Sequence, residues 1–345
     1  MEHGYCMGLD AHCTTCELVC VTPAGRRTRR WSTPTAIPPL VEAIETVRRP
    51  RRLALEEGPM ADWLMRQLAP YVDEVIVCDP RRNRLIAEGG DKEDDLDAEK
   101  LANLLRGGFL TPVHHPETWE REVFKRHVML YHSRVGRRVR EANTVTNWFR
   151  RFGLVLCEKD FADAASREEW LAKLPPGKLL RADTQILFEG YDQAAWQEDV
   201  LRRQLIRQAR EHEPIRRLTA LPGVMWIHAS TFFVLVDTPF RFRSKSALWK
   251  YMGIGLERRG SGKGPRRVHT PQSCNRRLKG TILSAAKSAV TSEESPFAAQ
   301  YRRLTERGLS PTIARRTVAR SLAATMWGML KSGDVYRPEL VGASG

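Results

Sequence analysis

The sequence predicts a mixed α/β domain at the N-terminus, followed by a helical middle part and a mainly α C-terminal part. In the first 112 residues, short apolar runs of strand length alternate with amphipathic segments of helical period. Several runs are connected through helices, so at least part of the sheet is expected to be parallel. Beyond residue 112 the apolar spacing is helical over long stretches. We therefore expect three domains, covering residues 1–112, 113–213 and 214–345.

Composition and turn residues place the elements of the N-terminal domain. The first strand is expected to end at Asp10 and the third at Glu56. Strands are expected at Gly4–Leu9, Glu17–Thr22, Arg52–Leu55 and Glu74–Cys78, with helices at Ile37–Val47, Met60–Leu68 and Lys92–Leu105.

Four acids form a candidate metal site. Asp10 and Glu56 follow two strands, and Asp94 and Asp97 stand three apart in the acidic helix. The carboxyl ends of parallel strands face a shared crevice, and residues three apart share a helix face. The four carboxylates can therefore converge, although acids in a first helical turn also occur simply because the helix dipole favours them.

Carboxylate oxygens are the ligands that Mg²⁺ prefers, and Mn²⁺ is an alternative ion. A pair of divalent ions held by such carboxylates can neutralise charge during phosphodiester cleavage. The sequence leaves open whether one or two ions bind. It also leaves open whether Glu56 or Glu57 is the ligand, although the position directly after the strand favours Glu56.

The middle part is expected to be helical from Trp119 to Arg151, at Asp160–Leu174 and from Leu179 to Glu213. The last of these segments carries a seven-residue apolar repeat typical of a coiled coil, which fits either an intramolecular hairpin or a dimer contact. The repeat consists of Leu180, Leu187, Ala194 and Leu201.

The positive charge is concentrated near the C-terminus. Between Arg241 and Arg320 the chain has 19 Lys and Arg against 4 acids, a net +15 that equals the net charge of the whole chain. This distribution is typical of a surface that binds a phosphate backbone. A Pro-Gly corner at Leu218–Val224 resembles the turn of a helix-hairpin-helix, where Gly223 presents backbone amides to phosphate.

A basic, glycine-rich segment from Gly253 to Arg267 is expected to be a loop. Ser261 lies between two glycines and among cations, a setting that suits a covalent nucleophile attacking phosphorus. The same composition also fits a flexible linker that only touches phosphate, and Ser244 or Ser273 could be the reactive hydroxyl instead. Helices are expected at Arg276–Val290 and Ser310–Lys331.

Seven scattered cysteines, without a signal pattern or an 18-residue apolar run, predict a reducing, cytoplasmic setting and no membrane association. Zinc binding by Cys13, Cys16 and Cys20 is not favoured, because no second pair of ligands follows at the required spacing.

Taken in order, these motifs resemble the DEDD transposases, insertion-sequence recombinases related to the Piv-type DNA invertases. The N-terminal match rests on Gly8-Leu9-Asp10, Leu55-Glu56-Glu57-Gly58 and Lys92-x-Asp94-x-x-Asp97-Ala98. The C-terminal match rests on Leu221-Pro222-Gly223, Phe240–Lys245, Tyr251-Met252-Gly253, Ser261-Gly262, Asn275–Lys279 and Ala285-Ala286. Cys274 departs from the family, which usually has Gly before the Asn.

The resemblance implies a RuvC-like (RNase H-fold) domain whose acids bind Mg²⁺, a coiled-coil middle and a C-terminal domain with a nucleophilic serine. It implies a bacterial, nucleoid-associated protein that acts on donor and target DNA as a dimer or tetramer. In such an oligomer, the acids of one protomer and the serine of another form a composite active site. Some members are guided by a structured bridge RNA. Carried over by position, the catalytic residues are Asp10, Glu56, Asp94, Asp97 and Ser261. The residues expected to bind nucleic acid are Gly223, Arg258, Arg259, Lys263, Arg266, Arg267, Arg276, Arg277 and Lys279.

Two other functions fit the same residues. A RuvC-like metal-dependent nuclease or junction resolvase would use the acids without a covalent intermediate. A nucleic-acid-binding protein that has lost its catalytic site would use neither the acids nor the serine for catalysis. The intact set of four acids argues against this function.

Overall fold

The computed structural model describes residues 4–80, 94–259, 267–269, 271, 273–292 and 294–338, with only the backbone for 94–96, 257–259 and 267–269. The chain divides into two compact units, Met1–Pro116 (unit 1) and Glu117–Gly345 (unit 2). The helical middle part and the C-terminal part expected from the sequence therefore lie in one compact unit. Unit 1 is mixed α/β, and the described part of unit 2 is mostly helical.

Unit 1 is built on a five-stranded sheet in the order β3-β2-β1-β4-β5. The first three strands are antiparallel, whereas β4 runs parallel to β1 and β5 runs parallel to β4. The parallel pairs follow from the helices that connect them. The strands are β1 (Tyr5–Ala11), β2 (Thr15–Val21), β3 (Arg27–Pro34), β4 (Arg51–Glu56) and β5 (Glu74–Cys78).

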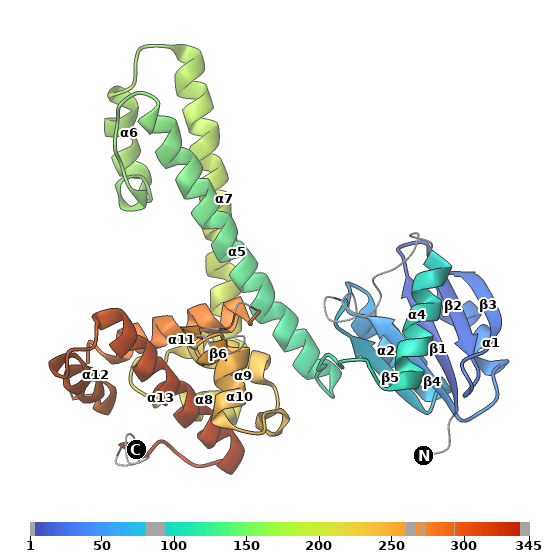
Figure 1. Ribbon diagram of the computed structural model, residues 1–345. Helices are drawn as coiled ribbons and strands as arrows, with labels where there is room; N and C mark the ends of the chain where they lie inside the picture. Colours follow the sequence, from blue (N-terminus) through green and yellow to red (C-terminus); the bar gives the residue numbers. More distant parts are fainter. Residues whose placement is uncertain are drawn as a thin grey trace. The chain divides into compact units, whose positions relative to one another are not determined.

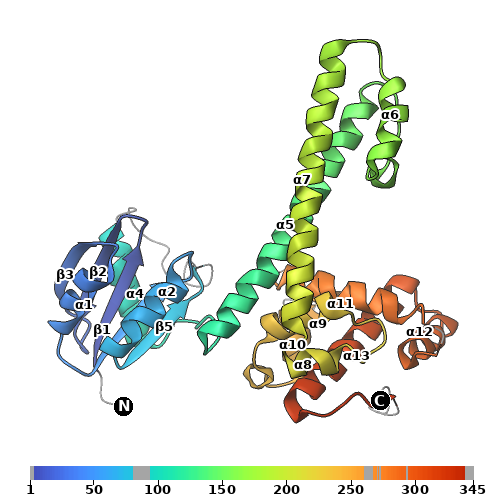
Figure 2. The same cartoon turned by 180° about the vertical axis from the view of Figure 1, so that it is seen from behind.

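Helices cover both faces of this sheet. Figure 1 shows α4 (Asp94–Gly107) across one face, and Figure 2 shows α1 (Ile37–Glu45) and α2 (Ala61–Leu68) over the other. A short 3₁₀ turn, η1 (Ala69–Tyr71), follows α2. Side chains alternate along β1, so Met7 and Leu9 join the α1/α2 core while Cys6 joins the α4 core.

The sequence reading missed β3. Its burial pattern is exposed over most of its length, and its composition is charged. It is the edge strand beside β2, so it lacks the apolar alternation that identifies a half-buried strand. The expected β-rich run at Glu17–Thr22 begins two residues earlier, at Thr15, and Asp10 lies inside β1 rather than after it.

Unit 2 contains a long helical hairpin. α5 (Trp119–Arg150) and α7 (Lys178–Ala209) pack along each other, and the region near their far end includes η2 (Glu158–Asp160) and α6 (Ala164–Ala172) (Figure 1). The buried positions of α7 are Thr184, Phe188, Tyr191, Ala194, Leu205 and Ala209, so only Ala194 of the predicted heptad is fully buried. The buried face of α7 packs against α5 of the same chain, and the seven-residue repeat lies only partly on that face.

Shorter helices gather around the hydrophobic α9, whose residues Ala229–Val236 are all buried. Two of them, α10 and α12, were not expected from the sequence. These elements are α8 (Glu213–Leu218), α9 (Trp226–Val236), η3 (Pro239–Arg241), α10 (Lys245–Tyr251), α11 (Arg276–Ala289), α12 (Pro296–Glu306) and α13 (Pro311–Ser332).

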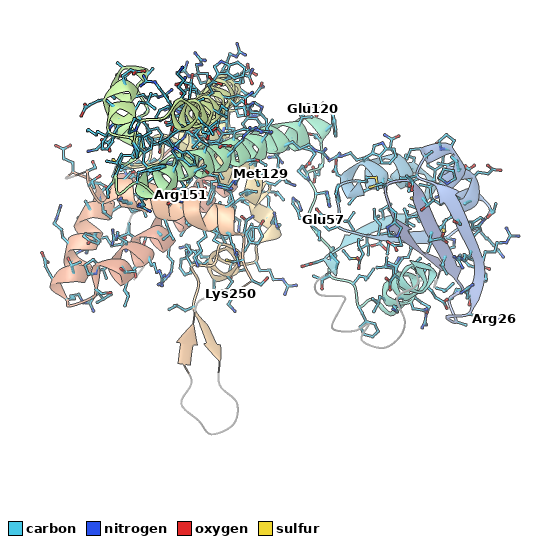
Figure 3. The ribbon with its side chains drawn as sticks, turned by 90° about the horizontal axis from the view of Figure 1, so that it is seen from above. Arg26, Glu57, Glu120, Met129, Arg151 and Lys250 are labelled. Atoms are coloured by element: carbon cyan, nitrogen blue, oxygen red, sulfur yellow. The ribbon has the colours of Figure 1, made fainter. Side chains whose placement is uncertain are left out.

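The segment expected to be a loop from Gly253 to Arg267 contains two short strands. β6 (Glu257–Arg259) pairs antiparallel with β7 (Arg267–His269), and Figure 3 shows this hairpin extending away from the helices of unit 2. The expectation of a loop is therefore wrong at these strands. The glycine-rich, charged composition predicted a turn, and strands of only three residues each are too short to give a recognisable sequence pattern.

Among the helices in the described ranges, none is both long enough and apolar enough to cross a bilayer.

Candidate functional site

Gly8 brings α4 into contact with β1. A Cβ atom at Gly8 would lie 2.0 Å from the Ala98 carbonyl oxygen and 2.6 Å from the Ala102 amide nitrogen. Real Cβ atoms do not approach backbone atoms that closely, so only glycine allows the helix to lie this near the strand. Ala98 and Ala102 are fully buried at this contact.

The contact fixes the direction of α4. Cys6 shares a core with Ala102 and Leu105, whereas Gly8 faces Ala98, so α4 runs antiparallel to β1. From Gly8 to Asp10 the strand advances about 6.6 Å. From Ala98 back to Asp94 the helix retreats about 6 Å. Asp10 therefore lies level with the first turn of α4, which carries Asp94 and Asp97.

Glu56 lies beside Asp10 at the end of the neighbouring strand. β1 and β4 pair in register with Leu9 opposite Leu55, so Asp10 and Glu56 come next on the two strands. Leu9 and Leu55 both face the α1/α2 core, and the next residues face the α4 side. Register thus brings together two acids that are 46 positions apart in the sequence.

Asp10 has polar neighbours on that face. His12 Nε2 lies 3.2 Å from Asp10 Oδ2, and the Asp10 side chain is 23% exposed. Glu17 stands directly opposite Asp10 in the β1–β2 register, is 9% exposed and accepts a 3.0 Å hydrogen bond from Arg30 Nε. Asp97 is exposed and accepts a 3.1 Å hydrogen bond from Lys100 Nζ. Arg30 and Lys100 offset the charges of Glu17 and Asp97, whereas Glu17 adds a further carboxylate next to Asp10.

Glu57, labelled in Figure 3, is held in a different group of residues. Its Oε2 lies 2.8 Å from His115 Nε2, and His115 Nδ1 lies 3.4 Å from Asp62 Oδ1. Arg66 donates to both Asp62 carboxylate oxygens at 3.1 Å and to the Pro116 carbonyl at 2.6 Å. These contacts attach the last residues of unit 1, His115 and Pro116, to α2 and to Glu57.

Among the described side chains, no three His, Cys, Asp or Glu residues form a group that could hold a metal ion. The side chain of Asp94 is not among them, so the expected set of four acids is described only in part. Cys13 is exposed, whereas Cys16 and Cys20 are buried in β2, and all three are free thiols. Burial raises the pKa of the Cys16 and Cys20 thiols, which opposes thiolate formation.

In unit 2 the expected nucleophile, Ser261, lies outside the described residues, as do Lys263 and Arg266. The base of the β6–β7 hairpin is described. The Asn275 backbone amide donates to the Tyr251 carbonyl at 2.8 Å, and Asn275 Nδ2 donates to the Tyr251 hydroxyl at 3.0 Å. Asn275 Oδ1 also accepts from the Leu278 amide at 3.0 Å and so caps α11.

The residues leading into β6 are also anchored. Gly253 has φ +70°, and a Cβ there would lie 2.4 Å from Cys274 Sγ. Cys274 thus packs directly on Gly253. Arg320 Nε donates to the Ile254 carbonyl at 2.9 Å, and Trp249 Nε1 donates to the Arg320 carbonyl at 3.0 Å.

The remaining basic candidates lie around this base. Arg259 and Arg267 stand at directly opposite positions of the hairpin, and Arg258 stands opposite Val268. Arg276 and Arg277 are exposed in the first turn of α11. Lys279, one turn further along the same helix, is partly buried, and its side chain lies near Gly253.

Gly223 has a packing role whether or not it contacts nucleic acid. Its φ is +78°, and a Cβ there would lie 2.3 Å from the Ala289 amide nitrogen and 2.5 Å from the Ala285 carbonyl oxygen. The Pro-Gly corner therefore packs against the C-terminal half of α11. This close approach explains the glycine without any ligand.

A buried histidine joins α5 to α9. His132 Nε2 lies 2.8 Å from Thr231 Oγ1, and burial lowers the pKa of His132 to about 4, with Arg277 and His228 acting in the same direction. His228 lies 3.3 Å from Ser284 Oγ of α11, and burial lowers its pKa as well. Both imidazoles are therefore expected to be neutral at pH 7.

Several of these residues were missed by the sequence reading. Glu17 could have been noticed, because an acid inside an apolar strand run is unusual. His12 could have been noticed for standing two positions after Asp10. Arg320 and His132 gave no local signal, because their partners lie 66 and 99 positions away.

Comparison with known proteins connects the chain to insertion sequences. Residues 215–302 match the model of the transposase IS116/IS110/IS902 family. The chain is 27% identical over 123 residues to an insertion element IS110 protein of Streptomyces coelicolor, covering 36% of this chain and 30% of the relative. It is 25% identical over 121 residues to an insertion element IS116 protein of Streptomyces clavuligerus, covering 35% and 30%. The chain thus spans about 30% of the length of these relatives.

Proposed function

We propose that this chain is an insertion-sequence transposase of the IS110 type, a DNA recombinase that cleaves and rejoins strands through a covalent phosphoserine intermediate. The observation that carries the proposal is the placement of Asp10 and Glu56 on the sheet face that meets the first turn of α4. The family match at 215–302 supports it from the other unit.

The strand order supports a RuvC-like assignment for unit 1. A mixed sheet ordered β3-β2-β1-β4-β5, with three antiparallel strands followed by two parallel ones, is the arrangement expected of an RNase H fold. The acids in such a domain would stand at the ends of the central strands and on the helix that crosses them. Here Asp10 is the penultimate residue of β1, Glu56 is the last residue of β4, and α4 packs on β1.

The carboxylate set suits Mg²⁺, with Mn²⁺ as a substitute, because hard cations prefer oxygen ligands. Asp10, Glu56, Asp94 and Asp97 would hold it, and bound Mg²⁺ would neutralise charge developing on phosphate oxygens. Two observations favour Glu56 over Glu57 as the ligand. Glu56 belongs to the strand face that carries Asp10, and Glu57 is paired with His115.

Ser261 is the proposed nucleophile. Its Oγ would form a bond to phosphorus as a phosphorus–oxygen bond of the DNA backbone breaks, and a DNA hydroxyl would later reverse the exchange. The number of phosphodiester linkages is conserved, so strand rejoining needs no external energy source. The anchors at Asn275, Gly253 and Arg320 would hold the base of the hairpin that carries this serine.

The basic residues around the hairpin are proposed to bind DNA. Arg259 and Arg267 stand at directly opposite positions of the β6–β7 pair, so the fold brings basic residues together in this hairpin. Arg276 and Arg277 lie in the first turn of a 14-residue helix, where the helix dipole favours phosphate. These groups would contact backbone rather than bases, so they would not select a sequence.

Guidance by a structured RNA and assembly into dimers or tetramers are part of the proposal and rest on the family resemblance. RNA guidance predicts that the protein, expressed with its flanking DNA, purifies with one discrete RNA. Heterogeneous RNA that is removed by moderate salt would contradict guidance, because it would reflect only phosphate binding.

A covalent-trapping assay tests the function. Wild type, Ser261→Ala and Asp10→Ala are incubated with the element's junction DNA, its flanking RNA and Mg²⁺, and the products are separated on denaturing gels. The proposal predicts an adduct in wild type that is lost in both variants. Ser244→Ala and Ser273→Ala serve as controls and should keep the adduct.

Metal-dependent nicking without an adduct, unchanged by Ser261→Ala, would replace the proposal with a RuvC-like nuclease. Complete absence of Mg²⁺-dependent cleavage would favour a nucleic-acid-binding protein without catalysis.

A further inference from the structure

A cavity of about 580 Å³ opens between the start of α5 and the end of α7, entirely within unit 2. Ligand pockets are commonly about 300–1,000 Å³ in volume. None of the residues that line it is a candidate catalytic residue, and Glu120, labelled in Figure 3, marks its α5 end. It is lined by Trp119, Glu120, Val123, Phe124, His127, Gln204, Arg207, Gln208 and His212.

Aromatic rings form the walls of this cavity. Phe124 is buried and stacks on His212, with ring centres 4.7 Å apart and planes 30° apart. Trp119 is 53% exposed, which is unusual for the largest aromatic side chain. Arg126 lies 5.7 Å from the Trp119 ring centre and helps to orient the ring. The cavity thus offers flat apolar surfaces to a planar ligand.

Polar groups in the same cavity have unmet hydrogen-bonding capacity. His127 Nε2 is buried without a hydrogen-bond partner. Within the described part of the chain, the side chain of Gln204 makes no hydrogen bond and the exposed Arg207 makes no ion pair. A buried polar atom without a partner is unfavourable, because it has lost its bonds to water without replacing them. A ligand that can both donate and accept would recover that cost.

We propose that this cavity binds one unstacked base of a single-stranded nucleic acid. The ring would stack against Trp119, its polar edge would bond His127 and Gln204, and Arg207 would pair with the adjoining phosphate. The inference rests on the proposed function, from which it takes nucleic acid as the partner. RNA and DNA share this chemistry, and the test below separates them.

A protein partner is the main competing occupant. A separate, smaller cavity of about 220 Å³ lies farther along the same two helices, where Leu130 and Trp196 are exposed. An apolar helix would cover Trp119 and Leu130 but would leave His127 Nε2 and Arg207 without partners. The polar groups therefore favour a base.

Photocrosslinking tests the proposal with full-length protein. Single-stranded RNA and DNA of the same mixed sequence, each carrying 5-iodouracil, are irradiated with the protein, and crosslinked peptides are mapped by mass spectrometry. We expect a crosslink to the peptide containing Trp119. A crosslink from RNA alone, from DNA alone or from both supports base binding in the cavity and shows which nucleic acid supplies the base.

Affinity measurements with unmodified oligonucleotides supply the second readout. Trp119→Ala should weaken binding by at least about fivefold, the lower end of the effect of losing one base–aromatic stack. Gln204→Leu, which removes the amide group, should weaken binding by a smaller factor. The matched control is Trp196→Ala, which removes an exposed tryptophan of the same helical hairpin and should leave affinity unchanged.

Crosslinks found only elsewhere, together with unchanged affinity in Trp119→Ala, would overturn the proposal. So would a Trp119→Ala protein that keeps its affinity but loses a dimer in light scattering, since that would identify a protein-docking groove. Ser261→Ala should keep the Trp119 crosslink. Failure of the recombinase proposal would therefore appear in the covalent-trapping assay and not in the photocrosslinking experiment.

Discussion

Unit 1 and unit 2 hold their candidate catalytic groups in different ways. In unit 1, the register of two parallel strands places Asp10 beside Glu56, and one glycine contact sets the position of α4. In unit 2, the segment containing Ser261 joins β6 and β7, and the described contacts hold only the base of that hairpin.

This difference predicts which substitutions should affect activity or stability in each unit. The acids of unit 1 depend on backbone geometry across the whole sheet, so a single backbone clash should disturb all of them together. The hairpin of unit 2 depends on a few hydrogen bonds and close contacts at Tyr251, Gly253 and Asn275. Loss of one of them should change activity more than overall stability.

The largest expected effect on activity comes from replacing Glu56 with glutamine, and it is compared with the same replacement at the adjacent Glu57. Glu56→Gln should lower the rate of Mg²⁺-dependent adduct formation by about 100-fold or more, because removing a group that stabilises transition-state charge commonly costs that much. Glu57→Gln should lower it by less than about fivefold, since Glu57 is paired with His115. Rates measured at saturating Mg²⁺ check this. A reversed order would identify Glu57 as the ligand.

A clash at Gly8 should disturb unit 1 as a whole. Gly8→Ala places a Cβ 2.0 Å from the Ala98 carbonyl and should destabilise unit 1 by about 3 kcal/mol or more. Gly58→Ala is the matched control, because a Cβ there meets nothing within 4 Å, and it should change stability by less than about 0.5 kcal/mol. Urea denaturation distinguishes the two variants. Equal stability would show that α4 does not depend on this contact.

The sequence predicted the sheet core of unit 1 better than its edge. The strand Glu74–Cys78 has the bounds expected, because both its composition and its flanking residues are typical of a strand. β3 was missed because an exposed edge strand can be charged throughout. The adjacency of Asp10 and Glu56 was expected from the parallel connection, but Glu17 and His12 joined the site through pairings that a linear pattern does not contain.

In unit 2 the helices were more predictable than their packing. The long helices follow from the 3.6-residue period, yet the seven-residue repeat did not identify the buried face of α7. Phe188 and Tyr191 are buried there because they meet Phe161 across the hairpin. Two of the hydrogen bonds that anchor the β6–β7 hairpin join residues 24 and 66 positions apart, and periodicity gives no information on such contacts.

His132 should make the stability of unit 2 depend on pH. An ordinary histidine binds its proton near pH 6.5, whereas burial lowers the pKa of His132 to about 4. Between these values the unfolded chain holds more protons, so this contribution is complete above pH 6.5 and is lost as the pH falls toward 4. It amounts to at most about 3 kcal/mol.

Denaturation of wild type and His132→Gln at about pH 7 and pH 5 measures this contribution. The variant should lose less stability than wild type on acidification. An equal loss in both proteins would assign the pH dependence to other groups.

The smallest expected effect on stability comes from the base of the hairpin. Asn275→Ala should destabilise unit 2 by about 1 kcal/mol through loss of a helix cap. It should also reduce adduct yield, because the bond to Tyr251 is lost. Ser310→Ala removes a comparable cap from α13 and should leave adduct yield unchanged. Equal yields in the two variants would show that the base of the hairpin does not position the serine.

The most direct test of the account is peptide mapping of the covalent protein–DNA adduct. After the reaction with junction DNA, flanking RNA and Mg²⁺, nuclease and protease digestion leaves one modified peptide for mass spectrometry. The account predicts a nucleotide attached to Ser261 in wild type and no modified peptide in Asp10→Ala. Attachment to another residue, or cleavage without any attached nucleotide, would contradict it.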